Sequence, residues 1–311
     1  MKKLILISGI LSILVIIACS NVSKEKNTLS EKTSIKESEV ITQQLSEEFK
    51  KYWYAGTAEI SSYQLEQARY GEIREGKAVL IYVTEDFLPS VQVKADRQHP
   101  ENIPVLKLNS TKNFVTGIYP YSIMQSTFYP VSDKKHAIKV SSSMQEWCGH
   151  VYTQLNNREQ FEIQSHSYFE GEADQQLALE KSILENELWT KIRINPDNLP
   201  VGDLQIIPSL AYCRLTHKEI KAYAAKVQLQ KDANISSYMI EYPALGRKIN
   251  INFTTDFPHE IESWTETFKS GYGTDAKELT TKGTKIKRIK SAYWGKKSSK
   301  DEILRKELGL N

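Results

Sequence analysis

Alternation of apolar and polar residues is the pattern that most constrains this chain. Residues 226–230 and 248–253 alternate strictly, as half-buried β-strands do, while residues 78–83 are apolar on both faces, as in a central strand. Further runs of β-branched and aromatic residues bring the expected strands to about ten or twelve. They are residues 54–70, 77–87, 105–114, 118–129, 137–142, 147–155, 161–169, 204–215, 222–230, 236–242, 248–257 and 261–268.

So many antiparallel strands predict a mainly β fold, either an antiparallel β-barrel or two curved β-sheets, because one open sheet would leave long exposed edges. One helix is expected to interrupt the strands at residues 175–192, before Pro196. Its apolar face consists of Leu177, Leu184, Leu188 and Ile192. Lys181 and Glu185 break that face. With 16 Tyr, 9 Phe and 5 Trp, the interior of such a fold could form an amphipathic pocket.

Residues 136–169 contain three expected strands joined by short polar turns, and we expect them near the middle of a sheet. In the strand at 147–155, alternate residues share a face. The set with Trp147 is the more apolar and is predicted to face the core, whereas Cys148 and His150 face the other side. On that interpretation, Trp147→Ala would cost about 3–5 kcal/mol.

The first 18 residues have the pattern of a signal peptide, with two lysines and an apolar run that is short for a membrane span. The run ends in Ile16-Ile17-Ala18-Cys19, which resembles the lipobox of bacterial lipoproteins, where the cysteine is lipidated and becomes the new N-terminus. The alternative is an N-terminal membrane anchor with an incidental cysteine. The lipobox predicts attachment to a membrane through acyl chains on Cys19.

The sequence predicts four regions: a signal peptide at 1–18, a lipidated flexible tether at 19–46, a β-rich domain at 47–295 and a basic tail at 296–311. The formal net charge of +3 falls to +1 without the signal peptide, which argues against nucleic acid as a partner. The lysines of residues 282–297 fit either a solvated edge strand or contact with anionic lipid head groups, and the edge strand is favoured.

Two further cysteines, Cys148 and Cys213, could form a disulfide in an oxidising compartment, or each could be a small buried hydrophobic residue. No catalytic residue is predicted. The i and i+2 spacing of Cys148 and His150 is too long on a strand for direct activation of the thiol. The segment that starts at His259 has serine where a zinc-protease helix needs its second histidine. Neither a metal nor another cofactor is expected.

Residues 50–294 resemble a family of uncharacterised Gram-negative lipoproteins through YWYAGTAEISSYQLEQARYGE, GKAVLIYVTEDF, GIYPYSIMQSTFYPV, IKVSSSMQEWCGHVY, LENELWTKIRINP and IKSAYWGK. Some of its members carry the label septum formation inhibitor Maf. Authentic Maf proteins are cytoplasmic α/β nucleotide pyrophosphatases that open with a Ser-rich, double-arginine motif. This chain has a lipobox and a β-rich pattern instead, so no pyrophosphatase residue is transferred to it.

These features predict a lipid-anchored lipoprotein of the envelope, most simply of the outer membrane, facing the periplasm or the cell surface. Its expected role is non-enzymatic binding of an apolar ligand or an envelope partner. The alternative is an envelope hydrolase whose site the sequence does not reveal. A binder should have an aromatic-lined cavity with few charges, and an enzyme should have titratable groups that converge in a cleft.

Overall fold

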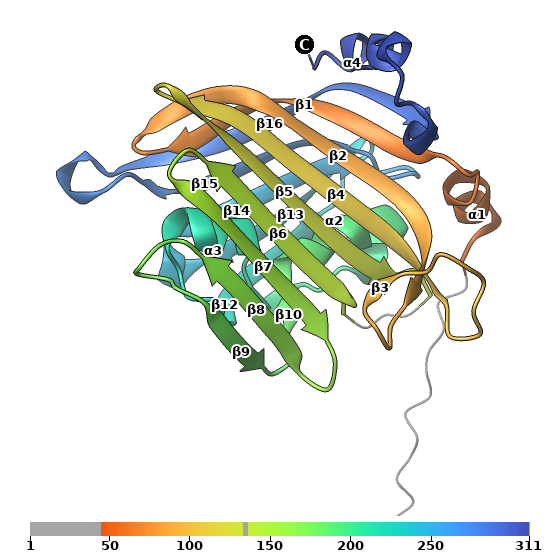
Figure 1. Cartoon of the computed structure of the whole chain (residues 1–311), viewed down its shortest axis with the longest axis horizontal. Helices are drawn as coiled ribbons and strands as arrows, with labels where there is room; N and C mark the ends of the chain where they lie inside the picture. The colour runs from red at the N-terminus through yellow and green to blue at the C-terminus, as the bar shows by residue number, and fades with distance from the viewer. Residues whose placement is uncertain (1–44, 133–135, 311) are drawn as a thin grey trace, which may run out of the picture. The chain divides into compact units, whose positions relative to one another are not determined.

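The computed structural model describes residues 45–132 and 136–310, which form a curved, mainly antiparallel 16-stranded sheet (Figure 1). The prediction of a mainly β fold is confirmed. The strands are β1 (Ala58–Arg69), β2 (Glu72–Leu88), β3 (Val93–Lys94), β4 (Ile103–Thr116), β5 (Tyr119–Pro130), β6 (Lys139–Glu146), β7 (Gly149–Asn157), β8 (Phe161–Ser167), β9 (Gln175–Leu179), β10 (Ile183–Leu184), β11 (Gly202–Ile207), β12 (Tyr223–Gln230), β13 (Ile235–Tyr242), β14 (Arg247–Thr254), β15 (Ile261–Ser270) and β16 (Lys277–Ser291).

The sheet curls into an incomplete barrel. Its strand order runs β10-β11-β12-β13-β14-β15-β16-β1-β2-β4-β5-β6-β7-β8-β9, with β3 paired to β2. β9 and β10 stand at opposite ends of this order, yet only residues 180–182 separate them in the chain, a span of at most about 14 Å. In the described part of the chain no ladder joins β9 to β10, so the barrel remains open along this seam.

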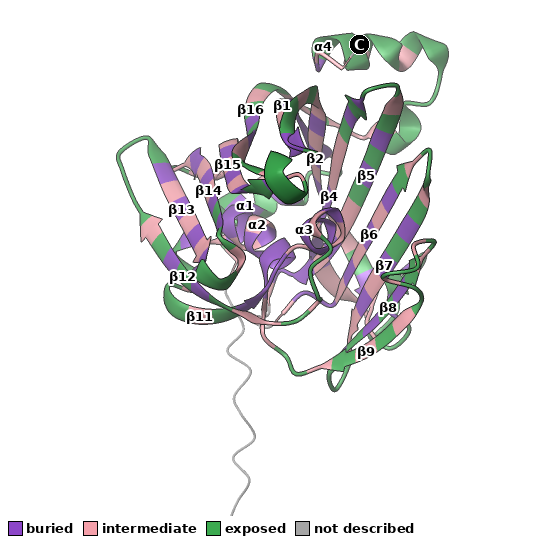
Figure 2. Ribbon diagram, turned by 90° about the vertical axis from the view of Figure 1, so that its left-hand side faces the viewer, coloured by how far each residue is buried: buried purple, intermediate pink, exposed green. Residues whose placement is uncertain are grey.

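Two helices, α2 (Glu185–Ile194) and α3 (Leu210–Thr216), occupy the space that the sheet encloses (Figure 2). The predicted helix at 175–192 is therefore correct only in its second half. Its first half forms β9, because β8 would otherwise be an unpaired edge and offers that segment a complete ladder of hydrogen bonds. Leu188 and Ile192, predicted on the apolar face, are fully buried.

The predicted strand at 204–215 is wrong in its second half. β11 ends at Ile207, and Pro208 follows, which has no N–H for a ladder. The chain then turns into α3 inside the barrel. The shorter helices are α1 (Glu47–Trp53), α4 (Ile303–Glu307), η1 (Pro196–Asn198), η2 (Pro243–Leu245), η3 (Gly273–Asp275), η4 (Tyr293–Gly295) and η5 (Ser299–Glu302).

The prediction that Trp147 faces the core is wrong. β7 begins only at Gly149, so Trp147 lies in the turn between β6 and β7, and its side chain is 69% exposed. The alternation itself is confirmed further along β7, where Val151 and Leu155 are buried and His150 is exposed. Trp147 therefore no longer gives a reason to expect a large loss of stability on truncation.

The C-terminal segment comprises β16 and then η4, η5 and α4. β16 pairs with β15 on one side and β1 on the other, so it is a central strand and the predicted lysine-rich edge strand is wrong. After β16, Leu308 is buried against Ala58, Ile60 and Val83 on the outer face of the sheet. None of the helices among residues 45–132 and 136–310 is long and apolar enough to cross a membrane.

Candidate binding site

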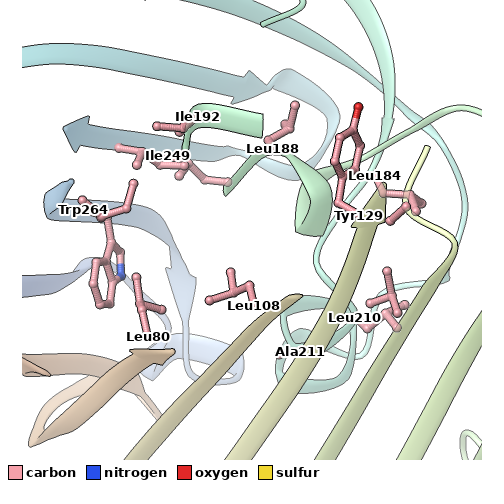
Figure 3. Packing of buried hydrophobic residues seen from close by; sticks show 14 of the residues in the cluster. Leu80, Leu108, Tyr129, Leu184, Leu188, Ile192, Leu210, Ala211, Ile249 and Trp264 are labelled. Carbon is pink, nitrogen blue, oxygen red and sulfur yellow. The ribbon is translucent and has the colours of Figure 1, made fainter. Parts of the chain in front are cut away.

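A cavity of about 70 Å³ lies between the inner face of the sheet and helices α2 and α3. Part of its wall is apolar and includes Leu80, Leu108 and Trp264, which the sheet directs toward α2 (Figure 3). The rest is polar and includes charged groups and amides. A volume of this size holds a few water molecules or a small part of a larger ligand.

Four charged side chains line the cavity, two of each sign: Lys112, Glu185, Arg247 and Glu266. The Arg247 guanidinium lies between the carboxylates, and its Nη2 and Nε donate to Glu185 and Glu266, each at 2.8 Å. The Tyr212 ring lies 3.8 Å from the guanidinium carbon. Burial alone would raise the pKa of Glu266, but the charges of Arg247 and Lys112 outweigh it and hold that pKa below its ordinary value.

Lys112 differs from the other three because it makes no hydrogen bond and no ion pair to any residue that the structure describes. Burial lowers the pKa of its ammonium group, and the attraction of Glu266 offsets only part of this effect. Gln67 also lines the cavity and is 1% exposed, and its Oε1 has no hydrogen-bond partner in the described part of the chain. The cavity thus contains an unused cationic donor and an unused acceptor.

Replacing Lys112 with methionine is expected to stabilise the protein by on the order of 1 kcal/mol at neutral pH, because a half-buried charge without a hydrogen bond is removed. Since the folded-state pKa of Lys112 is lowered, the parent gains stability as pH rises from that value toward the ordinary lysine pKa. The variant should lack this gain. Urea melts between pH 7 and 10 measure both effects, and a less stable variant at pH 7 would contradict them.

A second buried ion pair holds the other end of α2. The Arg193 guanidinium donates to both oxygens of Glu59 at 2.6 and 2.7 Å, and both side chains are 1% exposed. The Tyr52 hydroxyl also donates to Glu59. Since Glu185 binds Arg247 at the start of the helix and Arg193 binds Glu59 near its end, α2 is fixed to β14 and β1 by buried charges.

Helix α3 separates the cavity from two surface clefts of about 550 Å³ each. Tyr212, Leu215 and Phe268 line both the cavity and one cleft, so these three side chains form the partition between them. Cys213 lines the other cleft. Polar contacts hold the short helix at both ends. The backbone N–H of Ala211 donates to Gln125 Oε1 at 3.1 Å, and the carbonyl of Leu215 accepts from Arg69 Nη1 at 2.5 Å.

The structure does not bring the predicted cysteines together. Cys148 is exposed in the turn before β7, Cys213 is buried in α3, and both thiols are free. Burial raises the pKa of Cys213 to about 12, so its thiol is protonated at neutral pH and is a poor nucleophile. Cys19, the predicted lipidation site, lies outside the described residues. Among the described residues, no three His, Cys, Asp or Glu side chains could together hold a metal ion.

The charged residues of the cavity were not among the candidates from the sequence, although a signal was present. Arg247 shares its strand parity with Ile249 and Ile251, and Glu266 shares its parity with Trp264. Alternation therefore places both charges on the inner face, where a charge needs a partner. Charged residues at core-facing positions of strands were the signal for this site.

Three comparisons place the chain among known proteins only loosely. No family model matches the chain, and no curated protein matches it. A solved β-barrel-like protein of the domain of unknown function DUF1849 from Brucella abortus is similar over 75% of this chain and 98% of its own, with 10% identity and a TM-score of 0.43. A porin-like protein from Bacteroides uniformis matches 73% of this chain and 95% of its own, with 7% identity and a TM-score of 0.19. The resemblance to uncharacterised lipoproteins stays a prediction.

Proposed function

We propose that this protein is a lipid-anchored lipoprotein of the outer membrane that binds a small amphipathic ligand between its sheet and its inner helices, without catalysing a reaction. The observation that carries the proposal is the cavity, whose wall combines apolar side chains with unused polar groups. Leu108 and Trp264 would contact the apolar part of the ligand. Lys112 and Gln67 would bind its polar group. The anchor at Cys19 would hold the domain at a membrane that faces the periplasm or the cell surface.

The size of the cavity adds a condition to this proposal. Sites for drug-sized ligands usually measure about 300–1,000 Å³, so about 70 Å³ accepts only one end of such a molecule. A shift of α3 that moves Tyr212 and Leu215 would join the cavity to a cleft of about 550 Å³. The helix has only seven residues, but such a shift would have to break the hydrogen bonds of its first turn to Gln125 and Asn186 and the one from Arg69 to the carbonyl of Leu215.

The four charged side chains of the cavity are more than the few charges expected of a binder, but the way in which they are paired supports a binder better than a hydrolase. A hydrolase needs a general base or a nucleophile that is free to reach its substrate. The carboxylates in the cavity are both bound by Arg247, which donates to both oxygens of Glu185 and to Oε1 of Glu266. The Cys213 thiol is buried and protonated, and His150 is exposed on the outer face of the barrel.

Filling the cavity tests the proposal. Ala211 is buried and lines the cavity from α3, so Ala211→Leu should raise the dissociation constant of the apolar probe N-phenyl-1-naphthylamine about tenfold or more. Leucine favours helices, so the loss of stability should stay below about 1.5 kcal/mol. Ala178→Leu on the exposed face of β9 is the matched control and should leave probe affinity unchanged. Saturable binding that is equal in all three proteins would place the ligand elsewhere.

The lipid anchor has its own test. Replacing Cys19 with alanine removes the thiol that would carry the diacylglyceryl group, so metabolic labelling with a palmitate analogue should mark the parent and not the variant. Cys148→Ser, which removes the exposed thiol of the folded domain, is the control and should be labelled as strongly as the parent. Label retained by Cys19→Ala would contradict the lipobox interpretation.

A further inference from the structure

One end of the barrel gathers most of the exposed aromatic side chains at the apices of its hairpins. The β-pairings place the β1–β2, β4–β5, β6–β7 and β15–β16 turns at the same end, together with the segment that follows β8. These hairpins all point to the left in Figure 1, and Figure 2 views the barrel from this end. Each of these five connections carries a large exposed apolar residue, whereas the β13–β14 turn, residues 243–246 at the same end, carries none. The five residues are Tyr70, Ile118, Trp147, Tyr168 and Tyr272, with 36, 81, 69, 75 and 61% of the side chain exposed. We call these five residues the rim.

Turns at the opposite end of the barrel have a different chemistry. The β7–β8 turn consists of Arg158, Glu159 and Gln160, and the β12–β13 turn is residues 231–234, KDAN. Exposed apolar side chains do occur at that end, as with Val91 in the β2–β3 turn and Trp294 in the segment after β16, but no hairpin apex there carries an exposed aromatic ring among the described residues. Exposed aromatic rings at hairpin apices are therefore a property of one end and do not result from turns being exposed in general.

From this arrangement we propose that the rim docks the protein onto the surface of a phospholipid bilayer, with the rim side chains inserted among the head groups. Tyrosine and tryptophan have an apolar ring and a polar atom, which suits the boundary between head groups and acyl chains. The five residues come from separate connections. Ile118, Trp147 and Tyr168 are the most exposed, whereas the rings of Tyr70 and Tyr272 lie 6.2 Å apart and pack against each other. A protein partner would instead favour one continuous apolar patch.

The surroundings of the rim support a bilayer in two further ways. Charges next to the rim are of both signs, for example Glu146, Glu170 and Lys218, so insertion of the rings rather than attraction to an anionic surface would supply the affinity. Two rim residues, Tyr70 and Tyr272, also line one of the clefts beside α3. Docking would place the proposed entrance of the cavity against the membrane. The inference goes beyond ligand binding and does not depend on which ligand is bound.

The exposed, free thiol of Cys148 stands beside Trp147 and provides the test. The full-length chain, labelled there with the fluorophore NBD and floated with phosphatidylethanolamine and phosphatidylglycerol vesicles, should be quenched by doxyl-labelled lipids. The control carries the label at the other end of the barrel, on the cysteine of Ser90→Cys, in a chain that also has Cys148→Ser. This label should be quenched several-fold less. Only vesicles that carry the protein are measured. A difference in quenching between the two labels therefore reports which end of the domain faces the bilayer.

Substitution of the rim completes the experiment. Ile118→Ser together with Tyr168→Ser and Tyr272→Ser should reduce quenching at Cys148 to the level of the control label, whereas Trp294→Ser, which removes an equally exposed aromatic ring, should not change it. Quenching should also persist in 0.5 M salt. Equal quenching at both ends, or quenching that survives the triple substitution, would overturn the proposal. Absence of quenching at both labels, as for a rim that meets a protein, would overturn it too.

Discussion

Arg247→Met is expected to lower the free energy of unfolding by about 3–5 kcal/mol at pH 8, the usual cost of removing one partner from a buried ion pair. The variant leaves Glu185 and Glu266 buried without the guanidinium that binds both of them. Tyr212 also loses the cation over its ring. Methionine fills most of the vacated space, so the cost reflects the unpaired carboxylates more than a cavity.

The deficit of this variant should depend on pH. In the parent, the pKa of Glu266 lies below its ordinary value, so the stability from this group is present at neutral pH and is lost as pH falls through the lowered pKa. In the variant, burial without Arg247 favours the protonated carboxyl, so stability falls as pH rises above about 5. The difference between parent and variant should therefore grow between pH 4 and pH 8.

Chemical denaturation at several pH values measures both the deficit and its slope. Lys248→Met is the matched control, because Lys248 is the next residue of β14, has a side chain that is 69% exposed and pairs with Glu241 at the surface. Its cost should stay below about 0.5 kcal/mol at every pH. A deficit for Arg247→Met that is equally small, or that does not change with pH, would show that the buried cluster is not held together by its charges.

Alternation in the sequence predicted the fold because it records which side chain faces the core, and that property is local. The inner faces of β14 and β7 followed from it directly. The curling of the sheet into an incomplete barrel did not follow from alternation, since it depends on pairings between distant strands such as β1 with β16. The same reason explains the error at residues 282–297, where a crowd of lysines was interpreted as a solvated edge although β16 is a central strand.

The site was harder to predict than the fold, because its residues come from eight separate segments. Glu185 is instructive. In the sequence it interrupts the apolar face of the expected helix, and the structure shows that it lies on that face because Arg247 binds it. A single charged residue on the core-facing side of a helix indicates that a partner of opposite charge exists, but it does not identify that partner. Here the partner is Arg247, which lies 62 residues away in the chain.

Glu59→Gln is expected to cost about 3–5 kcal/mol as well, because it leaves the Arg193 guanidinium buried without its carboxylate. Arg193 retains a hydrogen bond from Nε to the carbonyl of Pro258 at 2.9 Å and the faces of Trp53 and Tyr82 at 5.0 and 4.6 Å. These contacts stabilise a cation without neutralising it. Glutamine preserves the size of the side chain, so packing changes little.

The pH dependence of this second variant should differ from that of the first. An arginine keeps its proton at every accessible pH, so the unpaired charge left by Glu59→Gln cannot be relieved by titration. Its deficit should therefore stay nearly constant from pH 6 to pH 9, whereas that of Arg247→Met should grow from pH 4 to pH 8. Glu241→Gln, at a surface ion pair, is the control and should cost less than about 1 kcal/mol. Denaturant melts of both variants over this range decide the comparison, because a deficit of Glu59→Gln that vanishes at pH 9 would mean that Arg193 is not buried as a cation.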